Sequence, residues 1–67
     1  GGVEAEITVK AILQAVTSFS DNRLVAQGAT ALSINLADDK VAELLEKLPD
    51  NPTAQLLREE IAWRVEA

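Results

Sequence analysis

The sequence predicts an all-α fold: a small bundle of about four short helices that ends in a C-terminal helical hairpin. Apolar residues in the C-terminal half recur at helical spacing, and two prolines lie at the turn between the last two helices. The composition, with 48% apolar and 25% charged residues, is typical of a globular domain. The alternative is an α+β fold with a short hairpin or strands in the N-terminal half.

The first eight residues are expected to lie outside the folded domain. Gly1 and Gly2 resemble a remnant of cloning, and from Val3 to Val9 apolar and polar residues alternate as they do in a strand. We therefore expect residues 1–8 to be such a remnant and a tail or linker. Residues 9–67 are expected to form a single small helical domain.

The first helix is expected from about Val9 to Phe19, behind a Thr8 cap. Its inward residues fit one helical face. They are Val9, Ile12, Leu13, Val16 and Phe19.

Residues 20–36 fit two patterns. As a helix capped by Ser20, the segment places Leu24, Gly28 and Leu32 on one face, together with Val25. As β structure, residues 21–22 would form a hairpin turn, and the apolar residues of 32–36 would alternate in a strand. We favour the helix because the four-residue step from Leu24 to Leu32 is helical and Ala-rich segments make poor strands.

The last two helices form the predicted hairpin. Asn35, with Asp38 three residues later, or Asp38 itself is expected to cap the first helix, and Pro49 ends it. Its apolar stripe is Val41, Leu44, Leu45 and Leu48. Asn51 is a good N-cap for the second, and Pro52 suits its first turn. We expect that helix to run from about Pro52 to Val65. Its inner face is expected to hold Leu57, Ile61 and Val65.

The residue types that carry most catalytic chemistry are missing. The chain has no His, Cys, Met or Tyr, so it lacks the usual ligands of transition metals and the usual base of a nucleophilic triad. The adjacent carboxylates Asp38-Asp39 and Glu59-Glu60 point in different directions on a helix and make no ready magnesium site. We expect no enzymatic activity, no catalytic residues, no metal and no cofactor.

The charge pattern disfavours nucleic acid as a direct partner. The net charge is −5, and no two of the six basic residues are adjacent, whereas phosphate binding needs clustered Lys and Arg. No apolar run approaches the roughly 20 residues of a membrane span, and no signal-peptide pattern opens the chain, so we expect a cytoplasmic protein that does not bind membranes. An acidic domain can also bind a basic protein, so an antitoxin or anti-repressor type of regulator is one alternative function.

The expected binding surface lies on the last helix. Leu56 and Trp63 are seven residues apart and lie to one side of the inner face, where they form a second apolar strip. Trp is a common interface anchor, and flanking charges can set the register of two partners. The predicted partner-binding residues are Leu56, Glu59, Glu60, Trp63 and Arg64. The sequence thus predicts a non-enzymatic docking or dimerisation domain of a larger assembly, whose partner is another protein or a second copy in a homodimer.

Two further resemblances concern the synthases of fatty acids, polyketides and peptides. Residues 21–24 leading to 28–32 resemble the approach to the prosthetic-group serine of carrier proteins, and Asn51-Pro52-Thr53 resembles the start of their last helix. No Asp-Ser-Leu motif occurs, and Thr30 or Ala31 falls where the modified serine would stand. The resemblance implies a degenerate carrier-like domain as the other alternative. The hairpin from Leu44 to Val65 is similar to the helical docking segments at the ends of modular synthase subunits.

Overall fold

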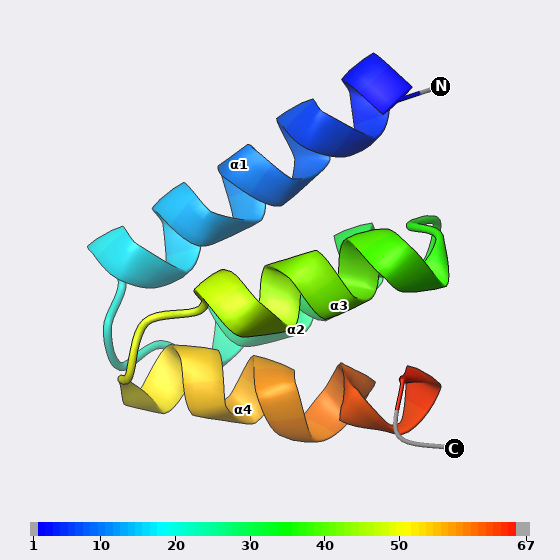
Figure 1. The fold of residues 1–67 in the computed structure, drawn as a ribbon. Coiled ribbons are helices and arrows are strands. Elements are labelled where there is room, and N and C mark those ends of the chain that lie inside the picture. Colours follow the sequence, from blue (N-terminus) through cyan, green and yellow to red (C-terminus); the bar gives the residue numbers. More distant parts are fainter. Residues whose placement is uncertain (1, 66–67) are drawn as a thin grey trace.

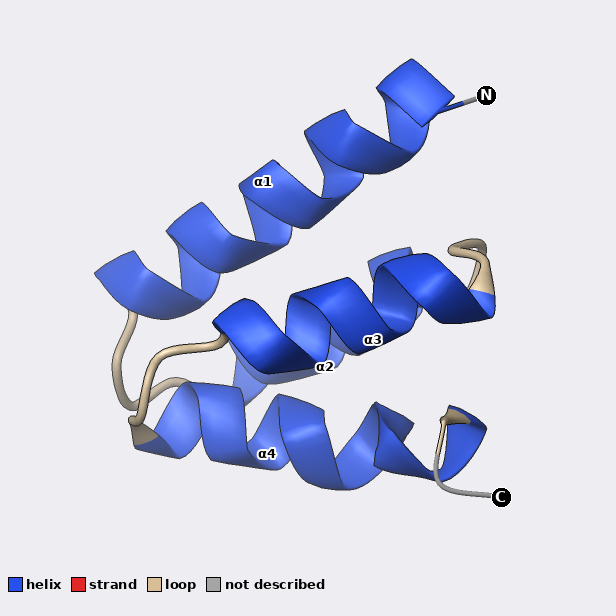
Figure 2. Ribbon diagram, in the orientation of Figure 1, coloured by secondary structure: helices blue, strands red, loops and turns tan. Residues whose placement is uncertain are grey.

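The structure, a computed structural model that describes residues 2–65, consists of helices joined by short connections (Figures 1 and 2). The elements are α1 (Gly2–Ser18), α2 (Arg23–Ser33), α3 (Asp38–Lys47), α4 (Pro52–Ile61) and the 3₁₀ turn η1 (Ala62–Arg64). Residues 2–65 contain no strand. The all-α prediction is confirmed, and the strand interpretations of residues 3–9, 17–27 and 32–36 are wrong.

The first helix begins seven residues earlier than expected, at Gly2 instead of Val9. Residues 2–8, expected to be a tail or linker, are the first turns of α1. Thr8 is not a cap, and its hydroxyl donates to the Glu4 carbonyl at 3.0 Å inside the helix. The alternating pattern wrongly indicated a strand, because Ala5 and Val9 fit a helical face as well as a strand face. Both point to the core, while Val3 and Ile7 are exposed.

Consecutive helices run in opposite directions, so that α3 and α4 form the expected C-terminal hairpin (Figure 1). Helix α2 lies behind α3 in this view and packs closely on α1 and α4. One apolar core joins all four helices. Its buried members are Val9, Ile12, Val16, Ala29, Leu36, Val41, Leu44, Leu48, Ala54, Leu57 and Ile61.

The start of α4 is tied to the connection between α1 and α2. Asn51 caps α4 as expected, because its Oδ1 accepts the Ala54 N–H at 2.8 Å, and its Nδ2 also donates to the Val16 carbonyl at 3.0 Å. The fully buried Thr53 hydroxyl donates to the Phe19 carbonyl and accepts the Asn22 N–H at 2.7 Å. These bonds fix where α4 begins relative to α1 and α2.

Two caps differ from the sequence-based expectation. Asn22, and not Ser20, caps α2, since its Oδ1 accepts the Val25 N–H at 3.0 Å. Ala37 stands at the N-cap of α3, so Asp38 lies in the first turn, where a carboxylate suits the positive end of the helix dipole.

The C-terminal end is shorter as an α-helix than expected. Helix α4 ends at Ile61, and the next three residues tighten into η1. Leu57 and Ile61 are buried as predicted, but Val65 is 38% exposed and is not part of the inner face. The expectation that Phe19 lies on the core face is also wrong, because α1 has ended there and the residue is 51% exposed.

Candidate docking surface

The surface predicted on the last helix is only partly available for a partner. Leu56 is half-buried, whereas Glu59 and Glu60 are exposed. Trp63 is 70% exposed and belongs to η1, which follows α4 directly, so the two apolar residues of the predicted strip lie in different types of helix.

Arg64, the fifth predicted contact, binds within its own chain. Its Nη1 donates to the Ser33 carbonyl at 2.8 Å, and its Nη2 donates to the Leu36 carbonyl at 2.6 Å and to Asp38 Oδ1 at 3.1 Å. The side chain is only 17% exposed. Arg64 thus holds η1 against the connection between α2 and α3, and its guanidinium is engaged internally.

A broader apolar surface lies on α1 and α2. An open groove of about 380 Å³ runs between these helices. Four of its lining residues are alanine or glycine, and the other three have larger aliphatic side chains. The lining residues are Ala11, Ile12, Ala15, Val25, Gly28, Ala29 and Leu32.

Large apolar side chains flank this groove. Leu32 is 54% exposed, and Ile7 and Leu24 are 61% and 77% exposed. Ile7 is four residues before Ala11, and Leu24 is four residues before Gly28, so each lies on the same helical face as a groove residue. We refer to the groove with Ile7 and Leu24 as the α1–α2 face.

Leu32 also lines a second hollow, of about 310 Å³, between the start of α1 and the end of α2. Its lining includes polar side chains. The lining residues are Glu4, Ala5, Thr8, Leu32, Asn35 and Leu36.

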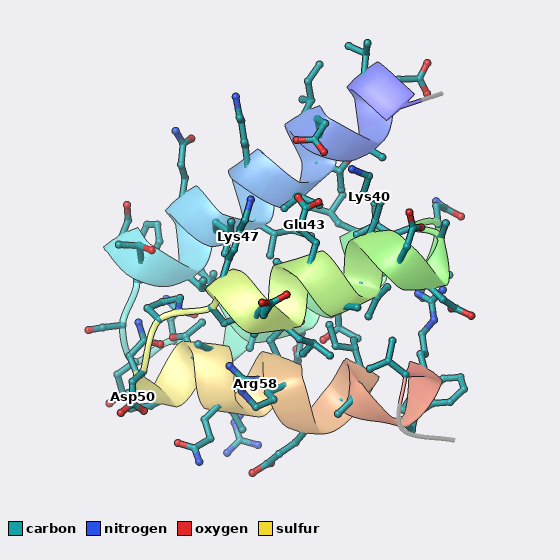
Figure 3. The ribbon with its side chains drawn as sticks, in the orientation of Figure 1. Lys40, Glu43, Lys47, Asp50 and Arg58 are labelled. Carbon is teal, nitrogen blue, oxygen red and sulfur yellow. The ribbon has the colours of Figure 1, made fainter. Side chains whose placement is uncertain are left out.

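Ion pairs join α3 to the start of α1 and run along α3. On the side where α3 meets α1, Lys40 pairs with Glu6 and, at 3.4 Å, with Glu43, which also pairs with Lys47 at 3.5 Å. Figure 3 shows Lys40, Glu43 and Lys47 along α3, in front of α2. The hydrogen bond and charge of Lys40 lower the pKa of the Glu6 carboxyl, and the hydrogen bond with Glu6 raises the pKa of Lys40.

Helix α2 is almost free of charge. No charged residue occurs between Arg23 and Asp38, although charged residues make up 25% of the chain. By contrast, α4 carries Arg58, Glu59 and Glu60 in succession, and α3 begins with Asp38 and Asp39. Helix α2 is therefore the least charged of the four helices, whereas α1 carries Glu4, Glu6 and Lys10.

The hydroxyl to which the carrier-like resemblance points is hydrogen-bonded within α2. Thr30 stands in the C-terminal half of α2 and is half-buried, and its hydroxyl donates to the Ala26 carbonyl at 2.9 Å. Its neighbour Ala31 has no hydroxyl.

Within residues 2–65, no cluster of three His, Cys, Asp or Glu side chains is placed to hold a metal ion. No helix in this part of the chain is long and apolar enough to cross a membrane. No family model, curated protein or solved structure matches the chain.

Sequence reasoning assigned Leu24, Gly28 and Leu32 to one helical face but did not identify that face as a surface. Ile7 was missed because it was placed in a tail. Two signals were present in the sequence: a glycine in the middle of a helix, and the absence of charge between Arg23 and Asp38. Both fall on the helix that forms one wall of the groove.

Proposed function

We propose that this chain is a non-enzymatic protein–protein interaction domain that docks through its α1–α2 face. The observation that carries the proposal is the exposure of three large aliphatic side chains, Ile7, Leu24 and Leu32, around a groove with several small residues in its lining. Soluble monomers rarely expose contiguous apolar patches larger than a few hundred Å², and such patches commonly mark interaction sites.

The chemistry of the face also fits docking better than small-molecule binding. Small-molecule sites are concave and place a few polar groups to orient the ligand. The described lining of the apolar groove supplies no polar side chain, and the groove is open along its length. Burial of aliphatic surface would supply affinity, and the absence of charge would avoid the cost of desolvating ions.

Leu56, Glu59, Glu60 and Trp63 form a second, smaller candidate surface on α4 and η1. The exposure of Trp63 agrees with an interface anchor, but the flanking carboxylates make this surface costlier to desolvate than the α1–α2 face. We therefore rank it below the α1–α2 face in the proposal.

Site-specific photo-crosslinking tests the proposal. A benzophenone amino acid is placed at Leu24, at Glu59 or, as a control on the outer side of α3, at the exposed Glu46, and cells that make the protein are irradiated. We expect a discrete adduct from Leu24 and none from Glu46. An adduct from Glu59 alone would move the docking site to α4, and indistinguishable products from all three positions would overturn the proposal.

A further inference from the structure

We propose that residues 62–65, which comprise η1 and Val65, act as a strap with two positions. In the closed position, which is the one in the structure, Arg64 ties the strap to the connection between α2 and α3. In the open position, Arg64 leaves that connection and the strap continues α4 as an α-helix. The inference goes beyond the proposed function, because it does not depend on docking at the α1–α2 face.

The closed position is held by the C-terminal end of α2. The last carbonyls of an α-helix lack intrahelical partners and attract cations, yet the last turn of α2 has no basic residue. Arg64 supplies the cation from 31 residues away, at 2.8 Å from the carbonyl of Ser33, the last residue of α2. The same guanidinium donates to the Leu36 carbonyl and to Asp38, and Figure 1 shows η1 at the same end of the molecule as this connection. Hydrogen bonds from an ionised donor are stronger than neutral ones, so Arg64 is the polar tie that keeps the strap closed.

The open position is favoured by the residues of the strap themselves. They include neither Gly nor Pro, and Ala and Arg are strong helix formers. Nevertheless α4 ends at Ile61, where φ is −115° and ψ is −10°, away from α-helical values. The Val65 N–H then donates to the Ala62 carbonyl at 3.1 Å, three residues back, in the poorer hydrogen-bond geometry of a 3₁₀ turn. The break in α4 is therefore not required by the residues that form it.

A continuous α-helix would give the strap partners of its own. Glu60 is exposed and stands four residues before Arg64, and a Glu placed N-terminal to a basic residue at this spacing is the favourable orientation for a helical ion pair. Val65, now 38% exposed, would lie four residues after Ile61 on the buried side of α4. Each position thus pairs the guanidinium, so opening exchanges one set of contacts for another.

The position of the strap decides whether the apolar strip on the last helix is continuous. Leu56 and Trp63 are seven residues apart, so they share one side of an α-helix that runs through both. In the closed position they lie in different types of helix. A partner that binds the continuous strip more tightly would therefore shift the strap toward the open position.

Nuclear magnetic resonance of the isotope-labelled 67-residue chain tests the strap, because Cα chemical shifts separate α-helix from unstructured chain at each residue. Arg64→Met removes the guanidinium and keeps a long side chain that favours helix. We expect a folded bundle in which the Cα shifts of residues 62–65 move toward α-helical values. The ratio of open to closed strap should rise at least about tenfold, as the loss of a hydrogen bond to a charged group implies. Arg58→Met is the matched control, since Arg58 is exposed on α4, and it should leave these shifts unchanged.

Three results for a folded Arg64→Met would overturn the strap. Shifts of unstructured chain would mean that Arg64 only pins a fraying end, unchanged shifts would mean that it does not hold the turn, and an equal change in Arg58→Met would make the effect unspecific. If Arg64→Met unfolds, Arg64→Lys keeps the charge but lacks the planar fork that reaches two carbonyls, so we expect a smaller move toward α-helical shifts. Loss of the bundle in both variants would also overturn the proposal, because the strap must open while the bundle stays folded. None of these outcomes bears on docking at the α1–α2 face, which photo-crosslinking tests separately.

Discussion

Replacing Thr53 by Val tests how α4 is fixed to the rest of the bundle. Val has nearly the shape of Thr, so the change keeps the packing of a side chain that is 0% exposed and removes only its hydroxyl. That hydroxyl accepts the Asn22 N–H at 2.7 Å and donates to the Phe19 carbonyl. Both partners lie in the connection between α1 and α2.

The loss can be worked out from these bonds. Leaving a buried donor or acceptor unsatisfied costs about 1–3 kcal/mol. At about 0.05–0.15 kcal/mol per residue, a 67-residue domain has a total stability of only about 3–10 kcal/mol. For a domain of this size, about 1 kcal/mol shifts the melting temperature by roughly 4–8 °C. We therefore expect Thr53→Val to melt at least about 4 °C below the wild type.

Thermal and urea unfolding are followed by circular dichroism at one fixed protein concentration, because self-association would make the melting temperature depend on concentration. Thr17→Val is the matched control. Its hydroxyl is exposed and donates at 2.7 Å to the Leu13 carbonyl within α1, so we expect a change within about 0.5 kcal/mol. Equal losses in the two variants would refute the assignment of Thr53 as the tie between α4 and the α1–α2 connection.

The remaining predictions concern the end of the chain, the core and the ion pairs. Arg64→Met should lower the free energy of unfolding by about 1–3 kcal/mol and change the fluorescence of Trp63, because η1 loses its bonds to two backbone carbonyls; an unchanged melting temperature would contradict this. Leu44→Ala should cost about 2–5 kcal/mol and Leu45→Ala less, since Leu44 is fully buried and Leu45 only half-buried, so equal losses in urea titrations would be inconsistent with the packing. The lowered pKa of Glu6 contributes stability that is present above its ordinary value of 4.5 and is lost as the pH falls through the lowered pKa of the folded state. Glu6→Gln should therefore flatten the acid limb of a plot of melting temperature against pH, and an unaltered limb would argue against the pair with Lys40.

The features that sequence reasoning predicted correctly are those set by residues close together in the chain. The apolar stripe of α3 repeats at helical spacing, and Asn51 followed by Pro52 is a local signal that begins α4 at the residue where the structure has it. The end of α4 was missed because it depends on a distant contact. Arg64 donates to the carbonyls of Ser33 and Leu36, which are about 30 residues earlier in the chain. The residues next to Arg64 in the sequence give no indication of this contact.

The start of α1 was missed for a different reason. Between Val3 and Val9 the sequence satisfies a two-residue and a helical period at once, and propensity alone does not decide between them. Packing decides, because Ala5 and Val9 of the helical face meet the core built by α2, α3 and α4. Because residues 2–8 are helical, Ile7 does not lie in a tail but on α1, at one edge of the α1–α2 face.

The α1–α2 face was hidden from sequence reasoning because it belongs to neither helix alone. On α1 the groove takes only two alanines and one isoleucine, and on α2 it takes a glycine, an alanine and two branched residues, so neither set differs from an ordinary core face. Trp63 is an interface candidate in the sequence because aromatic residues anchor many interfaces, although a single exposed apolar residue is common on protein surfaces. Gly28 is the more informative position. A glycine in a helix interior lowers helix stability relative to alanine, and the open space around Gly28 shows no contact within the fold that requires a glycine there. The sequence shows the glycine, but only the structure shows that a Cβ at this position would meet no atom of the chain within 4 Å.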